Sequence, residues 1–121
     1  MKNKNFYSGL KNALRGLQNA VRSERNLQIE LFAFAINLVL FAILDLTHVE
    51  IALVLFVCAL VLCMELVNTG IEKIADFMEP NWNDKIGLIK DLAAGAVLVA
   101  SFFALLVGLV IYLPRLQQVL F

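Results

Sequence analysis

Residues 65–76 read Glu-Leu-Val-Asn-Thr-Gly-Ile-Glu-Lys-Ile-Ala-Asp and directly follow an uncharged apolar run. At about 100° per residue, a helix places Glu65, Glu72 and Asp76 within roughly 40° of one another, with Asn68 about 60° away. A carboxylate at the end of a long apolar helix is costly unless it is paired, protonated or bound to a cation. The stripe formed by these four side chains therefore indicates a functional site.

The composition predicts an all-α integral membrane protein. The chain has 121 residues, is 61% hydrophobic and has a mean hydropathy of +0.82. Its uncharged stretches cover residues 31–44, 51–64 and 92–113. The last can cross a hydrocarbon layer about 30 Å thick alone, whereas the others need flanks that contain Glu30 or Glu65. We predict membrane helices at 26–44, 49–78 and 84–113 within a single domain, 1–121, with Pro114 ending the last helix.

The charges are segregated along the chain although the net charge is zero. Lys73, Lys85 and Lys90 lie between the second and third spans, while the turn at 45–50 has no Lys or Arg. The basic residues before the first span are Lys2, Lys4, Lys11, Arg15, Arg22 and Arg25. The positive-inside rule then predicts a cytoplasmic N-terminus and a cytoplasmic link between the last two spans.

Residues 5–22 show the pattern of a helix that lies along the membrane surface. The apolar positions, three or four residues apart, are Phe6, Leu10, Leu14, Leu17 and Val21. Basic and amide side chains fill the positions between them, as in interfacial amphipathic helices. Two readings stay open for Lys11 and Arg15: an anchor at lipid headgroups, or contact with a bound phosphate.

The connections between the predicted helices carry local signals. Pro80 should stop the second membrane helix, and Asn83 or Asp84 is suited to cap the third. Three helices enclose little interior, so an oligomer would shield the polar stripe more easily, and small residues at 93–96 permit close helix packing. Cys58 and Cys63 are interpreted as apolar residues, because their side chains diverge on one helix.

The stripe has the ligand chemistry of a magnesium site. Carboxylate and amide oxygens suit Mg²⁺, which usually keeps waters and is completed by substrate phosphates. The one histidine, His48, is predicted on the opposite side of the membrane, which argues against metal sites that need imidazole. Further polar groups on the stripe's side are Lys90 and Asp91 at the start of the third span and Glu24 and Glu30 at the start of the first.

This set of groups matches what phosphoryl transfer needs: a metal, a lysine near the transferred group and a carboxylate that receives a hydroxyl proton. Glu65 borders the uncharged run and suits a base that acts on a lipid alcohol. Glu72 lies nearer to water and suits the metal. The chain lacks the GxxxxGK[ST] loop of soluble nucleotide-binding proteins, so metal and side chains would hold the phosphates.

Other functions stay open at this point. The stripe can be a solvated helix face or a set of interhelical hydrogen bonds, and Lys90 with Asp91 can merely cap and anchor a helix. A small ion or proton transporter would use intramembrane acids to relay cations, but predicts acids spread across the membrane depth. A structural subunit without catalysis predicts that Glu65 and Glu72 tolerate alanine.

The segment ELVNTGIEKIAD, with KDLAAGAVLVA beginning fourteen residues after Asp76, resembles the signature of the bacterial diacylglycerol kinase and undecaprenol kinase family. The resemblance covers nearly the whole chain. It implies a small homotrimeric, multi-pass kinase of the bacterial inner membrane that uses Mg-ATP, with active sites shared between protomers and partners limited to ATP, a lipid alcohol and the bilayer.

The resemblance also implies roles for individual residues. Glu65 matches the proton acceptor, and Glu24 and Glu72 match metal-binding glutamates. The expected ATP-binding residues, including the two open basic positions, are Lys11, Arg15, Asn68, Glu72, Asp76, Lys90 and Asp91. The expected lipid-substrate residues are Asn26, Glu30 and Glu65. Asn81, Trp82 and Asn83 stand where the family more often has a Tyr-His pair, so they receive no role.

The lipid substrate is the remaining alternative. Thr69 and the run KDLAAGAVL resemble members assigned to undecaprenol more than the enterobacterial diacylglycerol type. Both lipids present a primary hydroxyl at the interface, so the core chemistry does not separate them. We favour undecaprenol, with diacylglycerol as the alternative.

Overall fold

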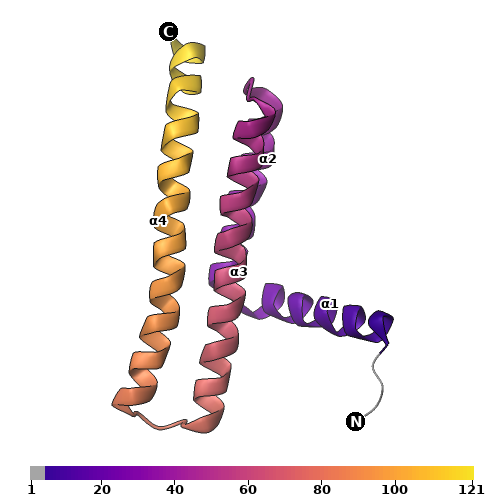
Figure 1. Cartoon of the computed structure of the whole chain (residues 1–121), viewed down its shortest axis with the longest axis vertical. Helices are drawn as coiled ribbons and strands as arrows, with labels where there is room; N and C mark the ends of the chain where they lie inside the picture. The colour runs from indigo at the N-terminus through magenta and orange to yellow at the C-terminus, as the bar shows by residue number, and fades with distance from the viewer. Residues whose placement is uncertain (1–4) are drawn as a thin grey trace.

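Four helices make up residues 5–121, which are the residues described by the computed structural model. They are α1 (Phe6–Ser23), α2 (Arg25–Ile43), α3 (His48–Met78) and α4 (Asp84–Leu120). The last three run side by side along the long axis, and α1 extends sideways from them (Figure 1). Lys2 and Lys4, two of the basic residues before the first span, lie outside the described residues.

Three helices are long and apolar enough to cross a membrane. They are α2, α3 and α4, with mean hydropathies of 1.8, 2.6 and 2.7 over their most apolar windows. At 1.5 Å per residue, α3 is about 46 Å long and α4 about 55 Å, so both exceed a hydrocarbon core of about 30 Å. Most of their apolar side chains are exposed, as expected for helices whose solvent is lipid.

The amphipathic helix α1 forms, and no residue in it is buried. Its apolar side chains have no protein partner that covers them; Phe6 is 88% exposed and Leu14 57%. Such a face suits the boundary between headgroups and acyl chains. A single extended residue, Glu24 (φ −101°, ψ 110°), separates α1 from α2. The Gln28 Nε2 group donates to the Val21 carbonyl at 2.9 Å and so caps the end of α1.

The links of the bundle are closed by side-chain caps. Thr47 and Glu50 form a reciprocal capping box at the start of α3. The Asn83 side chain accepts hydrogen bonds from the backbone N–H groups of Lys85 and Ile86, which confirms that Asn83 caps the last helix. Trp82 donates to Asp84 at 3.0 Å. Asn81, Trp82 and Asn83 received no functional role from the sequence. Trp82 and Asn83 therefore have at least a structural role in the link.

The prediction that Pro114 ends the last helix is wrong, because α4 continues through Pro114 to Leu120. Proline removes one N–H and crowds the preceding turn. Immediately after it, the Arg115 guanidinium bonds both carboxylate oxygens of Glu50 on α3, at 2.9 and 3.1 Å. This pair joins the continuation of α4 to α3 directly after the proline.

The α3–α4 hairpin is therefore tied by ion pairs near both of its ends. Arg115 and Glu50 form the pair at the end farther from the link, with about a quarter of each side chain exposed. Lys90 and Asp76 form the pair beside the link. The apolar stretch between the pairs carries the main packing of the hairpin.

We expect Arg115→Met to lower the melting temperature of the detergent-solubilised protein by several degrees. The substitution leaves a partly buried carboxylate without its charged partner, which costs more than the pair itself contributes. Gln117→Met, on the exposed side of the same turn, is the control and should leave the melting temperature unchanged. Equal melting temperatures for all three proteins would contradict a stabilising pair.

Candidate functional site

The predicted stripe on α3 passes from buried to exposed along the helix. Glu65 is 5% exposed and Asn68 7%, so both are buried. Glu72 is half-buried and Asp76 is exposed, one turn from the α3–α4 link. A buried carboxylate at one end of the stripe and water-accessible ones at the other fit a site that joins a membrane-embedded group to a water-borne one.

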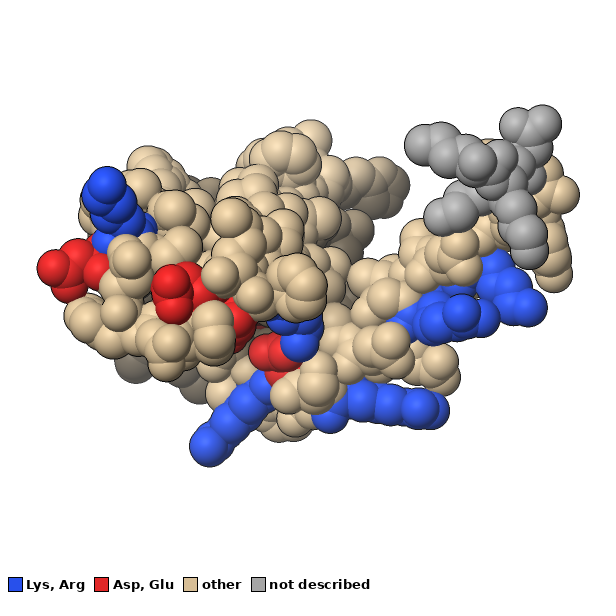
Figure 2. All heavy atoms as spheres, turned by 90° about the horizontal axis from the view of Figure 1, so that it is seen from below, with Lys and Arg blue, Asp and Glu red and all other residues tan. Residues whose placement is uncertain are grey.

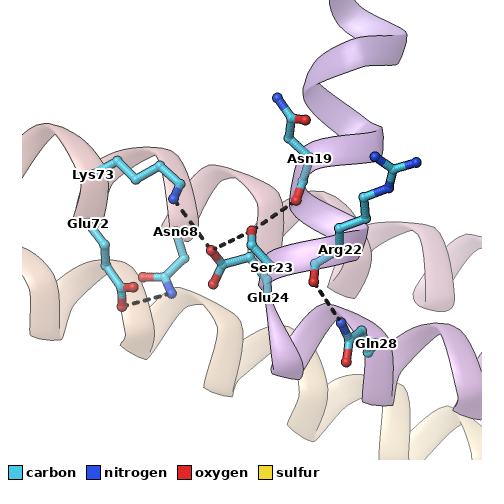
Figure 3. A network of polar contacts seen from close by, with 8 residues as sticks. All are labelled: Asn19, Arg22, Ser23, Glu24, Gln28, Asn68, Glu72 and Lys73. Atoms are coloured by element: carbon cyan, nitrogen blue, oxygen red, sulfur yellow. Dashed lines mark hydrogen bonds and ion pairs between the residues drawn. The ribbon is translucent and has the colours of Figure 1, made fainter.

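The corner between α1 and α2 brings a further carboxylate, that of Glu24, to this stripe. The Glu24 carboxylate accepts from Ser23 Oγ at 3.3 Å and lies 3.5 Å from Lys73 Nζ. On α3, the Asn68 amide donates to Glu72 Oε1 at 3.3 Å. In Figure 3 the Glu24 carboxylate points from the α1–α2 corner towards Asn68 and Glu72 on α3, and the Lys73 ammonium group points towards it. Two elements distant in sequence thus supply oxygen ligands to one region.

The α4 residues meet the exposed end of the stripe. Lys90 forms an ion pair with Asp76, fourteen residues away across the link. Asp91 is exposed and shares no hydrogen bond or ion pair with another described residue. Seen along the bundle axis from this end, acidic side chains lie over the bundle with basic ones among them, and further basic side chains extend along α1 (Figure 2).

Three predicted site residues lie apart from this cluster, whereas Glu30 lies near its buried end. Lys11 and Arg15 are exposed and line a separate hollow of about 430 Å³ on α1. Asn26 is exposed in the first turn of α2. Glu30 is half-buried and near enough to Glu65 for their charges to interact. The single chain thus brings together the predicted metal and phosphate groups of the α1–α2 corner, α3 and α4, but not Lys11 and Arg15 of α1.

The residues present fit Mg²⁺ as part of a coordination shell. The Asn68 Oδ1 atom is buried and has no hydrogen-bond partner, and an unpaired buried carbonyl oxygen is costly unless a ligand uses it. With the Glu24 and Glu72 carboxylates it would supply the oxygen donors that Mg²⁺ prefers. Within residues 5–121, no three His, Cys, Asp or Glu side chains could hold a metal by themselves. Substrate phosphates and waters would complete the shell.

Comparison with known proteins now identifies the family. Residues 11–112 match the model of the family described as prokaryotic diacylglycerol kinase, which covers most of the chain. The chain belongs to this family. The match spans α1 from its second turn, the corner, and α2, α3 and most of α4, so every candidate site residue lies within it. Membership in a membrane lipid kinase family argues against the transporter alternative.

Two curated relatives are similar to the chain at the same level. A diacylglycerol kinase of a Synechocystis species is 31% identical over 97 residues, or 79% of this chain. An undecaprenol kinase of Bacillus subtilis is 31% identical over 92 residues, or 76% of this chain. The chain spans 55% of the length of the first relative and 75% of the second. Equal identity to both leaves the lipid substrate undecided.

The structure adds groups to the site that the sequence analysis did not select. Lys73 pairs with Glu24, and Gln28 closes the corner that positions Glu24. Lys73 was the one charged residue of the ELVNTGIEKIAD segment that the stripe left out. The position of Lys73 directly after Glu72 was a usable signal that it belongs to the site. Its partner Glu24, however, lies 49 positions earlier in the chain, so only the geometry of the corner reveals the ion pair.

We expect Asn68→Leu to lower the affinity for the metal ion with little effect on the melting temperature. The change removes a buried oxygen that has no partner, which favours the folded state, and also the amide that donates to Glu72 at 3.3 Å, which disfavours it, so the melting temperature should change little. The affinity for Mn²⁺ in the presence of ATP, measured by electron paramagnetic resonance, should fall about tenfold, a loss typical of one hydrogen bond or ligand.

Thr69→Val is the matched control, since Thr69 is equally buried on the adjacent position of α3. It should leave Mn²⁺ affinity unchanged. Unaltered affinity in Asn68→Leu, or an equal loss in both variants, would remove Asn68 from the metal site.

Proposed function

We propose that this chain transfers the γ-phosphoryl group of ATP to the primary hydroxyl of a membrane lipid alcohol. The observation that carries the proposal is the single stripe on α3, where the buried Glu65 lies one to two turns from the pair of Asn68 and Glu72. A lipid hydroxyl and a water-borne triphosphate need a site that spans this boundary. Family membership supports the same reaction.

Glu65 would act as the general base. As the lipid oxygen forms its bond to the γ-phosphorus, the bond from that phosphorus to the bridging oxygen breaks and ADP leaves. The hydroxyl proton passes to the Glu65 carboxylate and then to water. The burial of Glu65 suits this role, because a carboxylate there has little competing water.

The remaining residues would hold the triphosphate. Mg²⁺, when bound, supplies positive charge that neutralises the phosphate oxygens, and Glu24, Glu72 and Asn68 are its proposed ligands. Lys90 would contact a phosphate, for which it must exchange its present partner Asp76. Asp76 and Asp91 would then face the nucleoside. Lys11 and Arg15 on α1 are proposed to approach the phosphates from a neighbouring protomer.

Within one chain, Lys11 and Arg15 lie apart from the other candidate site residues, which supports an active site shared between protomers. We infer a homotrimer, because the family resemblance implies one and because α1 and the lipid-facing helix surfaces have few partners within one chain. We also infer one lipid-kinase domain over residues 1–121 in a bacterial inner membrane. The N-terminus and the α3–α4 link would face the cytoplasm, where ATP is available, as the distribution of basic residues indicates.

Undecaprenol is our proposed substrate, and diacylglycerol is the alternative. The support for undecaprenol is the resemblance of Thr69 and the KDLAAGAVL run to members assigned to that lipid. Neither curated relative favours one lipid, since both are 31% identical to this chain.

A competition experiment tests the function and the substrate together. Purified protein in detergent receives radiolabelled Mg-ATP with equal amounts of undecaprenol and diacylglycerol, and thin-layer chromatography identifies the labelled lipid. We expect undecaprenyl phosphate as the main product and none after addition of a chelator in excess over Mg²⁺. Phosphatidic acid as the main product would reverse the substrate assignment, and the absence of both products would contradict the function.

We expect Glu65→Gln to abolish nearly all turnover while the protein stays folded and binds nucleotide. The amide keeps the size of the side chain but cannot accept the hydroxyl proton, and loss of a general base typically costs about 10²–10⁴-fold in kcat. Turnover, melting temperature and Mn²⁺-ATP affinity are the measurements. Glu79→Gln, in the link beyond the stripe, is the control. Near-normal turnover in Glu65→Gln would remove Glu65 from the catalytic role.

A further inference from the structure

A groove of about 520 Å³ runs between α2 and α4 over the surface of α3. Its lining is apolar apart from a few polar groups and includes Ala33, Val54, Val57, Val61 and Leu105. Each outer helix packs on α3, but α2 and α4 make few contacts with each other, so the groove opens sideways. This size and lining are typical of a small-molecule site.

One hydrogen bond joins the two walls of the groove. Tyr112 on α4 donates its hydroxyl to Asn37 Oδ1 on α2 at 2.6 Å. The Asn37 amide nitrogen in turn donates to the Ala33 carbonyl of its own helix at 2.9 Å, which fixes the side chain. Both residues line the groove. No other side-chain hydrogen bond joins α2 to α4 within residues 5–121.

The opposite end of the groove reaches the candidate active site. Glu30 lines the groove there, and its charge interacts with that of Glu65. Seven residues separate Glu30 from the bridging Asn37, which is about 10 Å along the helix. The bridge therefore crosses the groove about 10 Å, roughly a third of a hydrocarbon core, away from its polar end, and the lining continues about one turn beyond it to Leu116.

The groove's position favours a lipid tail over a helix. A helix in that place would cover the end at Glu30, through which a lipid alcohol could reach Glu65 from the bilayer. A hydrocarbon chain fits the apolar walls and leaves this path open.

We propose that the groove binds the first part of the hydrocarbon tail of the lipid alcohol, and that the Asn37–Tyr112 bridge forms a floor across it, one turn before the lining ends at Leu116, and determines how much tail is bound. The proposal rests on the function proposed above. The hydroxyl lies at Glu30 and Glu65, the adjoining methylene and methyl groups lie along α3, and the chain turns out into the bilayer at the bridge. Tyr112 and Asn37 are thus specificity-determining residues that do not touch the reacting atoms.

The first test varies tail length with polyprenols of increasing isoprene number. In the wild type, KM should fall with each added unit until the tail reaches the bridge and should then stay level. Tyr112→Ala opens the floor, so the level part should begin at longer tails, with KM for those tails about tenfold lower, as expected for two more buried methylene groups.

Leu98→Ala is the matched control on α4, because Leu98 is 71% exposed and lies outside the groove lining. It should keep the wild-type dependence on tail length. If Tyr112→Ala keeps that dependence as well, or if wild-type KM shows no levelling, the proposal is wrong. A purely structural role of the bridge predicts a uniform loss of kcat and melting temperature with no change in length preference.

The second test uses the wild-type cysteines and does not depend on a variant folding. Cys58 lines the groove, whereas Cys63 lies on another face of α3, exposed and outside it. A small membrane-permeant maleimide is applied in detergent micelles with saturating polyprenol or with the same amount of phosphatidylcholine. We expect polyprenol to slow alkylation of Cys58 about tenfold and to leave Cys63 unchanged, as followed by mass spectrometry.

The results of this test separate the two proposals. Equal alkylation of Cys58 with either lipid, or protection of Cys58 before polyprenol is added, would overturn the groove assignment; the latter would indicate a second copy or bulk lipid in it. Protection of Cys58 without any phosphorylation of polyprenol would support the groove and contradict the kinase function. Phosphorylation without protection would contradict the groove alone.

Discussion

Hydrocarbon offers no partner to a polar group, and this constraint shapes the whole molecule. The buried residues of the described chain are apolar except Glu65, Asn68 and Thr69, all on one stretch of α3. The other charged groups that meet across helices lie near the helix ends, where Lys90 pairs with Asp76 and Arg115 with Glu50. The cost of burying polar groups is thus concentrated in a single place, and that place is the candidate active site.

Local sequence information was enough to predict the helices and their links. Hydropathy and the spacing of apolar residues depend on the chain over a few turns, and they located three spans and an amphipathic helix close to the observed bounds. The cap at Asn83 follows from the same kind of local rule. The path of α4 beyond Pro114 was not predictable in this way, because the partner that holds it, Glu50, is 65 residues away from Arg115.

The same distinction applies to the candidate site. The order of Glu65, Asn68, Glu72 and Asp76 is a property of one helix, so periodicity alone revealed it. The pairs that cross between elements required coordinates. Lys73 with Glu24 and Tyr112 with Asn37 are examples, although a lone asparagine within an apolar span was a signal for the second. The roles of Lys11 and Arg15 depend on how protomers assemble, which one chain does not contain.

The corner at Glu24 links the membrane surface to the interior of the site. One residue serves both as the end of α1 and as the start of α2, and its carboxylate faces α3. Gln28 and Ser23 bond to backbone carbonyls of α1, at Val21 and Asn19, so the bend is braced on both sides. Such a braced joint couples the position of α1 to that of Glu24. In the proposed site, the depth of α1 among the headgroups would set the height of the Glu24 oxygens, so leaflet charge and lipid packing would act on the geometry around the phosphates.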